Sequence, residues 1–283
     1  MWDKAISSHT FFFYKLSPGD CEGKAKSVRM KMIRMIGMAM MAVLMGISLA
    51  SCSKDENPEK SEEGVVVNEK KLVKMDNGDG WKLIVKYDDK GRAIEITSET
   101  QNWCISSYRY TWGENIIMAI YEYSNTDNRH ETNSYTFTLE NGLVQKKTDN
   151  KGDIAFKYNA SNRLVEYGDK ESYIWDGDKL MAYNDFDRGY EYVKTYTYGT
   201  PCKKGYNLMI IDESYLDPLF LAHPELVGMR TKQIPSTCTF SPIGSGYNNS
   251  KTETDTHTYE FDKDGYVSKY TESNSYTNNY TWE

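Results

Sequence analysis

The sequence predicts an all-β fold: an antiparallel hairpin-repeat meander of about a dozen strands, curled into an open or partly closed barrel with a short helical insert. Three observations support this prediction. An alternating strand, a polar turn with Gly and a second alternating strand follow one another in residues 85–96, and this unit recurs. Aromatic residues stand two positions apart, so their rings share one strand face. Asn, Asp and Gly supply the positive φ that short turns need.

The hairpin copies extend from residue 85 to residue 267. They are residues 85–96, 108–117, 135–144, 156–165, 173–180 and 259–267. The alternations at 196–198 and 280–282 predict single strands. A slip of one residue would turn each aromatic row toward solvent, so the register is well specified. We expect one hairpin-repeat domain over residues 65–283.

The region before this domain predicts export. Lys31 and Arg34 precede an uncharged apolar run, residues 35–49, which ends in Leu-Ala-Ser-Cys52. This is the pattern of a signal peptide over residues 30–51, and the run is shorter than the about 20 residues of a transmembrane helix. Residues 1–29 are interpreted as a mis-start extension, because lipoprotein signals begin close to their apolar core.

Cys52 resembles the cysteine of the bacterial lipobox, whose sulfur is acylated. The alternative is an ordinary signal peptide with an incidental cysteine. Residues 52–64 are charged and contain Pro58, which predicts a flexible tether between lipid and domain. We therefore expect a membrane link through acyl chains on Cys52, with palmitate as one of them.

The charge balance excludes one class of partner. The chain has 34 basic and 41 acidic side chains, and removal of the first 51 residues leaves 27 and 38, a net charge of −11. Nucleic-acid binding needs a clustered basic face, so we expect no nucleic-acid partner.

The hairpin rhythm stops at an insert, at about residues 200–245. Residues 206–211 are predicted to form a strand. Asp217 as N-cap and Pro218 at the first helical position predict a helix start, and Gly228 predicts its end. This aliphatic segment is expected to cover one end of the sheet.

Cys202 and Cys238 flank this insert. An exported protein can form disulfide bonds, and a bond here would close a loop of about 35 residues and contribute about 3–4 kcal/mol. The sequence leaves open whether the bond forms. Cys104 would remain a thiol.

No pattern in the sequence indicates an enzyme. The histidines at positions 130, 223 and 257 lack metal-ligand spacing, and residues 76–80 resemble a calcium loop but have Tyr87 at the twelfth position, where Glu is needed. No nucleophile motif or phosphate-binding loop occurs. We predict no catalytic residue, no metal site and no cofactor.

Aromatic side chains suggest a binding function. Sugar rings stack on Tyr and Trp, although same-face rows are usually the buried side of a sheet. Rings on the opposite face would be more informative. Trp103 beside a turn, and Tyr190 and Tyr192 in a predicted polar loop, are the candidate ligand-binding aromatics.

The lipobox, the Tyr/Trp hairpins and the insert together resemble Bacteroidales lipoproteins of the domain-of-unknown-function family 4595. The most specific segment is residues 228–235, GMRTKQIP. The resemblance implies a porin-like antiparallel β fold and supplies no catalytic residues. Residues 87–92 and 261–265 are also similar to the tyrosine–aspartate repeats of the large bacterial Rhs shells.

These features predict an exported, lipid-anchored protein of the cell envelope. The short acidic tract just after Cys52, in residues 53–56 (SKDE), resembles the signal that places Bacteroidetes lipoproteins on the outer face of the outer membrane. The periplasmic leaflet is the alternative. The first functional hypothesis is a non-catalytic module that binds a glycan or an envelope protein. The second is a structural or interaction component of an envelope complex, and a hydrolase is the third.

Overall fold

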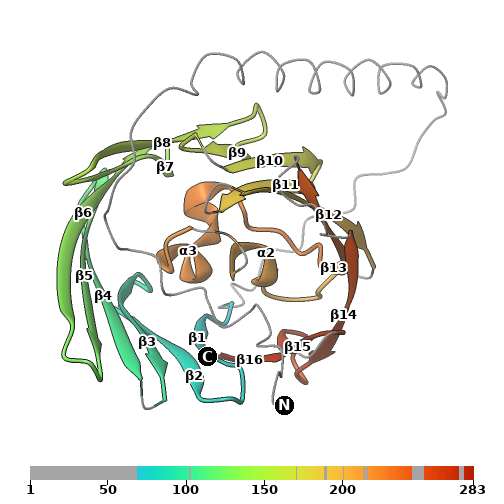
Figure 1. Ribbon diagram of the computed structural model, residues 1–283, viewed down its shortest axis with the longest axis horizontal. Coiled ribbons are helices and arrows are strands. Elements are labelled where there is room, and N and C mark those ends of the chain that lie inside the picture. The colour runs from blue at the N-terminus through green and yellow to red at the C-terminus, as the bar shows by residue number, and fades with distance from the viewer. Residues whose placement is uncertain are drawn as a thin grey trace, which may run out of the picture. The chain divides into compact units, whose positions relative to one another are not determined.

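The computed structural model describes residues 69–101, 103–169, 171–187, 190–199, 201–212, 214, 216–243, 252–273 and 277–283. In this part of the chain, sixteen antiparallel strands form a closed barrel, with sequence neighbours paired (Figure 1). The strands are β1 (Leu72–Asp76), β2 (Trp81–Tyr87), β3 (Ala93–Thr100), β4 (Cys104–Trp112), β5 (Ile116–Asn125), β6 (His130–Glu140), β7 (Leu143–Asp149), β8 (Gly152–Tyr158), β9 (Leu164–Tyr167), β10 (Glu171–Asp176), β11 (Lys179–Asp187), β12 (Tyr190–Tyr198), β13 (Pro235–Ile243), β14 (Glu253–Phe261), β15 (Val267–Glu272) and β16 (Thr277–Trp282). The signal, the tether and Cys52 lie outside the described residues.

The barrel closes through its first and last strands. β1 pairs with β16, with Leu72 opposite Trp282 and Met75 opposite Tyr280. The predicted all-β hairpin meander is confirmed. The expectation of about a dozen strands was too low, and the barrel is closed where the prediction allowed an open sheet. Hairpin signals report only local pairing, whereas closure joins two segments at opposite ends of the domain.

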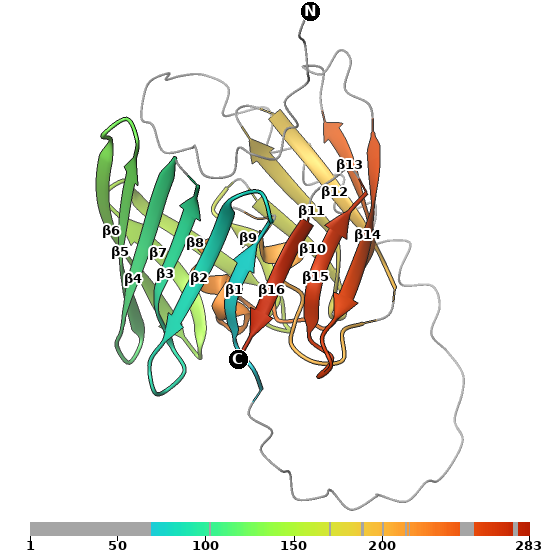
Figure 2. The same cartoon turned by 90° about the horizontal axis from the view of Figure 1, so that it is seen from below.

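The two ends of the barrel differ. The turns after even-numbered strands lie at one end, together with the insert between β12 and β13 and the C-terminus; we call this the insert end (Figure 2). The turns after odd-numbered strands lie at the opposite end, the distal end, because antiparallel neighbours alternate in direction.

Three hairpin turns at the insert end share one hydrogen-bonding scheme. In the turns that begin at Asp88, Asn159 and Asp262, the side-chain oxygen accepts backbone N–H bonds from the residues two and four positions later, at 2.9–3.0 Å. The residue three positions later has positive φ and is Gly or Asn in each turn. The Asn, Asp and Gly pattern of the sequence is therefore turn chemistry.

A repeated hydrogen bond explains the aromatic residues near the insert end of the barrel. In seven even-numbered strands, a ring near the strand's end donates to a backbone carbonyl at or beside the start of the preceding strand. The pairs, at 2.5–2.8 Å, are Tyr87 to Leu72, Trp112 to Ala93, Tyr158 to Val144, Trp175 to Leu164, Tyr198 to Leu180, Tyr259 to Pro235 and Trp282 to Val267. These aromatic residues hold adjacent strands together.

Removal of one such hydroxyl tests this explanation. We expect Tyr87→Phe to lower the free energy of unfolding by about 1–2 kcal/mol, because the hydroxyl donates to Leu72 O at 2.7 Å and the ring itself is retained. Urea denaturation is the measurement. Thr281→Val removes an exposed hydroxyl and is the control. Equal midpoints for the two variants would show that the aromatic hydrogen bond adds nothing.

The insert lies inside the ring of strands (Figure 1). It contains α2 (Met209–Asp212), α3 (Leu219–Ala222) and the 3-10 helix η2 (Pro224–Val227), and the side chains of α3 are all buried. The helix starts one residue later than predicted, because Pro218 is the N-cap of α3 and not its first residue; Asp217 Oδ1 still accepts the Leu219 N–H at 3.0 Å. Gly228 ends η2 in the left-handed region, at φ 63°, as predicted.

The strand predicted for residues 206–211 is wrong. Asn207 Oδ1 accepts the Met209 N–H at 3.0 Å, and the chain turns there into α2. The Tyr206 hydroxyl donates to Leu221 O, which joins this segment to α3. The apolar residues of this segment are buried against the rest of the insert and the barrel wall, so burial, and not strand pairing, accounts for their pattern.

The first described residues fasten onto the insert end. Lys71 and Glu283 exchange two backbone hydrogen bonds at 2.6 and 2.9 Å. Glu69 bonds to Arg230 of the insert, and Lys70 pairs with Asp264 at 2.7 Å. The chain therefore enters the barrel beside the insert.

The outer face of the barrel carries cross-strand ion pairs. Lys82–Glu99, Lys86–Glu95 and Arg109–Glu122 are each separated by 2.7 Å, and Lys146–Asp153 and Lys269–Glu260 by 2.9 and 2.8 Å. Among the described residues, no helix is long and apolar enough to cross a membrane.

Candidate functional site: a tyrosine wall inside the barrel

A row of tyrosines lines the inner surface of three long strands. We call the tyrosine wall the five residues Tyr108, Tyr110, Tyr121, Tyr123 and Tyr135. Tyr108 lies opposite Tyr121 with ring centroids 4.9 Å apart, and Tyr110 and Tyr135 both lie opposite Ala119. Because strand residues two positions apart share a face and are about 7 Å apart, the wall follows β4 and β5 from the distal end toward the insert.

The wall ends at a buried carboxylate of the insert. Asp217 Oδ2 accepts the Tyr135 hydroxyl at 2.5 Å, and Oδ1 accepts the Tyr110 hydroxyl at 2.7 Å. Asp217 is 8% exposed and also accepts the Leu219 N–H. Three donors therefore satisfy this carboxylate, and they fix the insert to the barrel wall.

Exposure along the wall increases away from the insert. Tyr110 and Tyr135 are 4% and 7% exposed, whereas Tyr108, Tyr121 and Tyr123 are half-buried. Glu131, opposite Tyr123 on β6, is exposed. Solvent therefore reaches the inner wall from the distal side, while the insert covers its other end.

Polar groups stand beside the partly exposed rings. Glu131 lies opposite Tyr123, and Asn133 lies opposite Tyr121. Burial raises the pKa of Tyr121, a hydrogen bond with Ser106 opposes this rise, and the nearby Glu131 charge adds to it. Rings next to amide and carboxylate groups form a surface that suits a ligand with both apolar faces and hydroxyl groups.

The predicted aromatics lie toward the distal end. Trp103 stands in the turn between β3 and β4, is half-buried, and its carbonyl accepts the Thr126 N–H. Tyr192 lies in β12 and not in a loop; it shares a strand face with the buried Tyr196, and its ring is 4.6 Å from that of Phe240. The prediction that it lies on the face opposite the rows is therefore wrong.

Tyr190 is also in β12, although its side chain lies outside the described part of the chain. The predicted polar loop is a strand because residues 190–192 pair with β11, Tyr190 opposite Asp187. The Trp103 backbone lies beside the distal end of β5, since its carbonyl accepts the N–H of Thr126, which directly follows β5. The structure does not place Tyr192 on the strands that carry the wall.

The Cys202–Cys238 disulfide, which the sequence left open, is not formed in the structure, and both side chains are buried. The Cys202 N–H donates to Lys232 O at 2.8 Å, before β13 begins. Cys238 is three residues inside β13, about 10 Å farther along at the usual rise of a strand. Bridged cysteines need Cα atoms within about 7 Å, so this offset accounts for the difference.

The other titratable residues considered in the sequence have structural contacts. His223 Nε2 accepts the Ala93 N–H at 3.0 Å, and Nδ1 lies 2.9 Å from Glu225. Asn77 Oδ1 caps the turn that resembles a calcium loop, where it accepts the Asp79 and Trp81 N–H groups. No cluster of three or more His, Cys, Asp or Glu suited to a metal ion occurs among the described residues.

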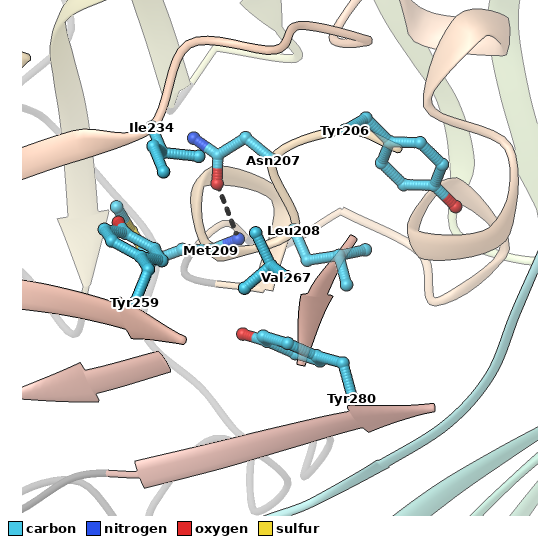
Figure 3. A pocket seen from close by; sticks show the side chains of 8 residues that line it. All are labelled: Tyr206, Asn207, Leu208, Met209, Ile234, Tyr259, Val267 and Tyr280. Carbon is cyan, nitrogen blue, oxygen red and sulfur yellow. Dashed lines mark hydrogen bonds between the residues drawn. The ribbon is translucent and has the colours of Figure 1, made fainter. Parts of the chain in front are cut away.

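A small pocket lies between the insert and the barrel wall (Figure 3). Its lining comes from the segment around Asn207 and Met209 on one side and from Tyr259, Val267 and Tyr280 on the other. Its volume is about 10 Å³, the space of about one water molecule. This pocket is therefore a packing defect and not a ligand site.

Sequence reasoning assigned the residues of the tyrosine wall to the core. The assignment fits Tyr110 and Tyr135, which contact the insert. It misses the half-buried rings because the pattern of aromatics is the same along the whole strand. The available signal is strand length: β5 and β6 have 10 and 11 residues and continue past the level of Asp217.

The buried tyrosines predict a sharp alkaline transition. Burial is the main cause that raises the pKa of nine described tyrosines: 87, 108, 110, 121, 135, 158, 167, 198 and 206. Their pKa values in the folded state exceed the unfolded value of about 10, so their stabilising contribution is complete below pH 10 and is lost as the pH rises above it.

We therefore expect the barrel to unfold cooperatively above about pH 10, with tyrosinate absorbance and loss of the β-sheet circular dichroism signal changing together. A freely titrating set of tyrosines at about pH 10, with the β-sheet signal unchanged, would contradict this prediction.

The barrel is similar to two crystal structures of Bacteroides proteins. A porin-like protein from Bacteroides vulgatus is 11% identical, with a TM-score of 0.52 over 75% of this chain and 98% of that chain. A porin-like protein from Bacteroides uniformis is 17% identical, with a TM-score of 0.40 over 76% of this chain and 96% of that chain. The likeness to the first supports the fold alone. No family model and no curated protein matches the chain, so the resemblances to family 4595 and to the Rhs repeats are not confirmed.

Proposed function

We propose that this protein is an exported cell-envelope lipoprotein, anchored through Cys52, whose barrel is a non-catalytic module that binds glycans on its inner surface. The observation that carries the proposal is the tyrosine wall: its rings are partly exposed inside a barrel that the insert covers at one end. Aromatic rings beside hydrogen-bonding groups are the surface that sugar rings contact.

The outer face supports anchoring by lipid and not by the strands themselves. A barrel that spans lipid needs an apolar outer band. Here Lys82–Glu99, Lys86–Glu95 and Arg109–Glu122 form ion pairs on the outer face of β2 to β5. These ion pairs support a barrel that stands in water, with the acyl chains on Cys52 as its link to the membrane.

The point where the tether joins the barrel indicates which end of the barrel is nearer to the membrane. Glu69 and Lys70 are fastened at the insert end, and the tether precedes them in the sequence. The insert end is then nearest to the membrane, and the distal end with the tyrosine wall faces away from it. A ligand that arrives from outside meets the accessible side of the wall first.

The site supports binding better than catalysis. The buried carboxylate at the end of the wall, Asp217, is engaged by two tyrosine hydroxyls and a backbone N–H, so it has a structural role. A closed barrel offers no strand edge for an added peptide strand. Partly exposed rings beside an amide and a carboxylate suit a hydroxyl-rich chain.

Cell fractionation and protease shaving test the location. Cells with the native protein should incorporate labelled palmitate into it, and Cys52→Ser should abolish the label. Protease added to intact cells should remove the domain if it is on the outer face. Protection until lysis would place it in the periplasm and redirect the search for ligands to periplasmic glycans. If the native protein takes up no labelled palmitate, the proposal that acyl chains on Cys52 anchor it is wrong.

One observation favours the second candidate, an interaction component of an envelope complex. On the outer face of β4 and β5, four aliphatic side chains are 40–50% exposed: Ile105, Ile116, Met118 and Ile120. This row is separate from the inner wall, because its members alternate with inward residues. Met118→Lys would weaken assembly in a complex while leaving glycan binding unchanged, which separates the two candidates.

A further inference from the structure

The geometry points to a specific binding site: the distal half of the tyrosine wall, formed by Tyr108, Tyr121 and Tyr123 with Glu131 and Asn133, which takes a neutral oligosaccharide lengthwise and discriminates against acidic glycans. This inference rests on the proposed glycan-binding function and adds the site, the direction of entry and the charge preference.

The rings are arranged for consecutive contacts along a chain. Tyr121 and Tyr123 are two positions apart on β5 and so share the inner face about 7 Å apart. Tyr108 packs against Tyr121, with centroids 4.9 Å apart and an interplanar angle of 42°. The two strands therefore form one continuous aromatic surface on which the sugar rings of one chain can stack in turn.

The wall has a defined end. Tyr110 and Tyr135, the next residues toward the insert, donate their hydroxyls to Asp217 and are almost fully buried. Their hydroxyls are therefore engaged, and a ligand cannot pass between them without displacing the insert. The ligand enters from the distal end and stops at this pair.

The charges beside the wall select against anions. Glu131 is exposed opposite Tyr123, and Asp149 lies on the inner face of β7, in line with Lys147. The Lys147 ammonium lies 4.0 Å from the centre of the Tyr135 ring, at the buried end of the wall. A uronic-acid chain would meet carboxylates first, whereas carboxylate and amide oxygens accept bonds from neutral sugar hydroxyls.

Calorimetry with defined hexasaccharides tests the site. The full-length mature protein is titrated with cello-, xylo-, manno- and chito-hexaose, and with hexagalacturonate as the acidic probe. We expect at least one neutral hexasaccharide to bind about tenfold more tightly than the acidic one. Tyr121→Ala and Tyr123→Ala should each weaken that affinity about tenfold, because each removes one stacking surface.

The matched control is Met118→Ala, on the same strand but on the outer face and 47% exposed. It should bind as the native protein does. Tyr121→Phe keeps the ring and should retain most of the affinity, which separates stacking from loss of fold. Glu131→Gln should narrow the difference between neutral and acidic probes while the neutral affinity stays within a few-fold.

The binding results separate this inference from the function on which it rests. Absence of binding to every neutral and acidic glycan overturns the glycan-binding function itself. Glycan binding that is unchanged in Tyr121→Ala and Tyr123→Ala leaves the function intact and overturns this site. Tightest binding of hexagalacturonate overturns the charge preference.

Discussion

Gly228→Ala is expected to lower the free energy of unfolding by about 3–5 kcal/mol, one of the two largest effects we predict. Gly228 has φ 63°, and a Cβ atom there would lie 1.8 Å from the backbone oxygen of Asn162. The atom that the added Cβ would contact belongs to the backbone of the turn between β8 and β9, so rotation of a side chain cannot relieve the contact. Either the turn or the insert has to move.

Movement of that turn would break further contacts. Arg163 donates through Nη1 to Gly228 O at 3.1 Å and to Arg230 O at 2.7 Å, and its guanidinium lies 5.1 Å from the Trp175 ring centre. These bonds tie the insert to β8, β9 and β10. Their loss explains why the expected effect exceeds the cost of an unfavourable φ alone.

Gly177→Ala is the matched control. Gly177 has φ 58°, almost the same conformation, but it lies at the hairpin tip between β10 and β11, where a Cβ atom would meet no described atom within 4 Å. The substitution should cost about 1–2 kcal/mol, the conformational part alone. Urea denaturation measures both variants, and equal losses would show that the contact with Asn162 is relieved without cost.

The local elements of this fold could be predicted from sequence, because each is written in adjacent residues. Asp88 and Asp262 cap turns at positions where the sequence has the Asn, Asp and Gly pattern, and Asp217 accepts the N–H of Leu219, the first residue of α3. The pairing of β1 with β16 has no such local signal, since Leu72 and Trp282 are at the two ends of the domain. Closure therefore appeared only in the structure.

The sequence could predict that the candidate site consists of aromatic rings on one strand face, but not which of these rings remain accessible. Alternating aromatics indicate rings on one face, and the structure places them inside the barrel. The sequence does not distinguish Tyr110, which the insert covers, from Tyr121 on the next strand, which it leaves half-buried. That difference depends on where Asp217 docks. Tyr192 was misplaced because residues 190–192 were interpreted as a polar loop, whereas they pair with β11 in a local hairpin, with Tyr192 opposite Asp185.

Asp217→Ala is the second large effect, with an expected loss of about 3–5 kcal/mol in the free energy of unfolding. The carboxylate accepts hydroxyl bonds from Tyr110 at 2.7 Å and Tyr135 at 2.5 Å, and it caps α3 through the Leu219 N–H. Alanine would leave two buried hydroxyls and a helix N–H without this acceptor. Each unsatisfied group costs about 1–3 kcal/mol.

Asp217→Asn is the matched variant, since its amide oxygen can still accept while its NH₂ group cannot. We expect it to lose about half as much as Asp217→Ala, because one tyrosine keeps an acceptor. A double-mutant cycle with Tyr135→Phe isolates the pair: the double variant should cost clearly less than the sum of the two single variants, since each removes the same bond.

An additive cycle would mean that Tyr135 and Asp217 stabilise the fold independently. The insert would then be held by burial alone, and the end of the tyrosine wall would not be fixed. A coupled cycle, together with unchanged stability in Tyr121→Phe, would assign the two halves of the wall different roles. The half at Asp217 fastens the insert, and the distal half remains accessible to ligand.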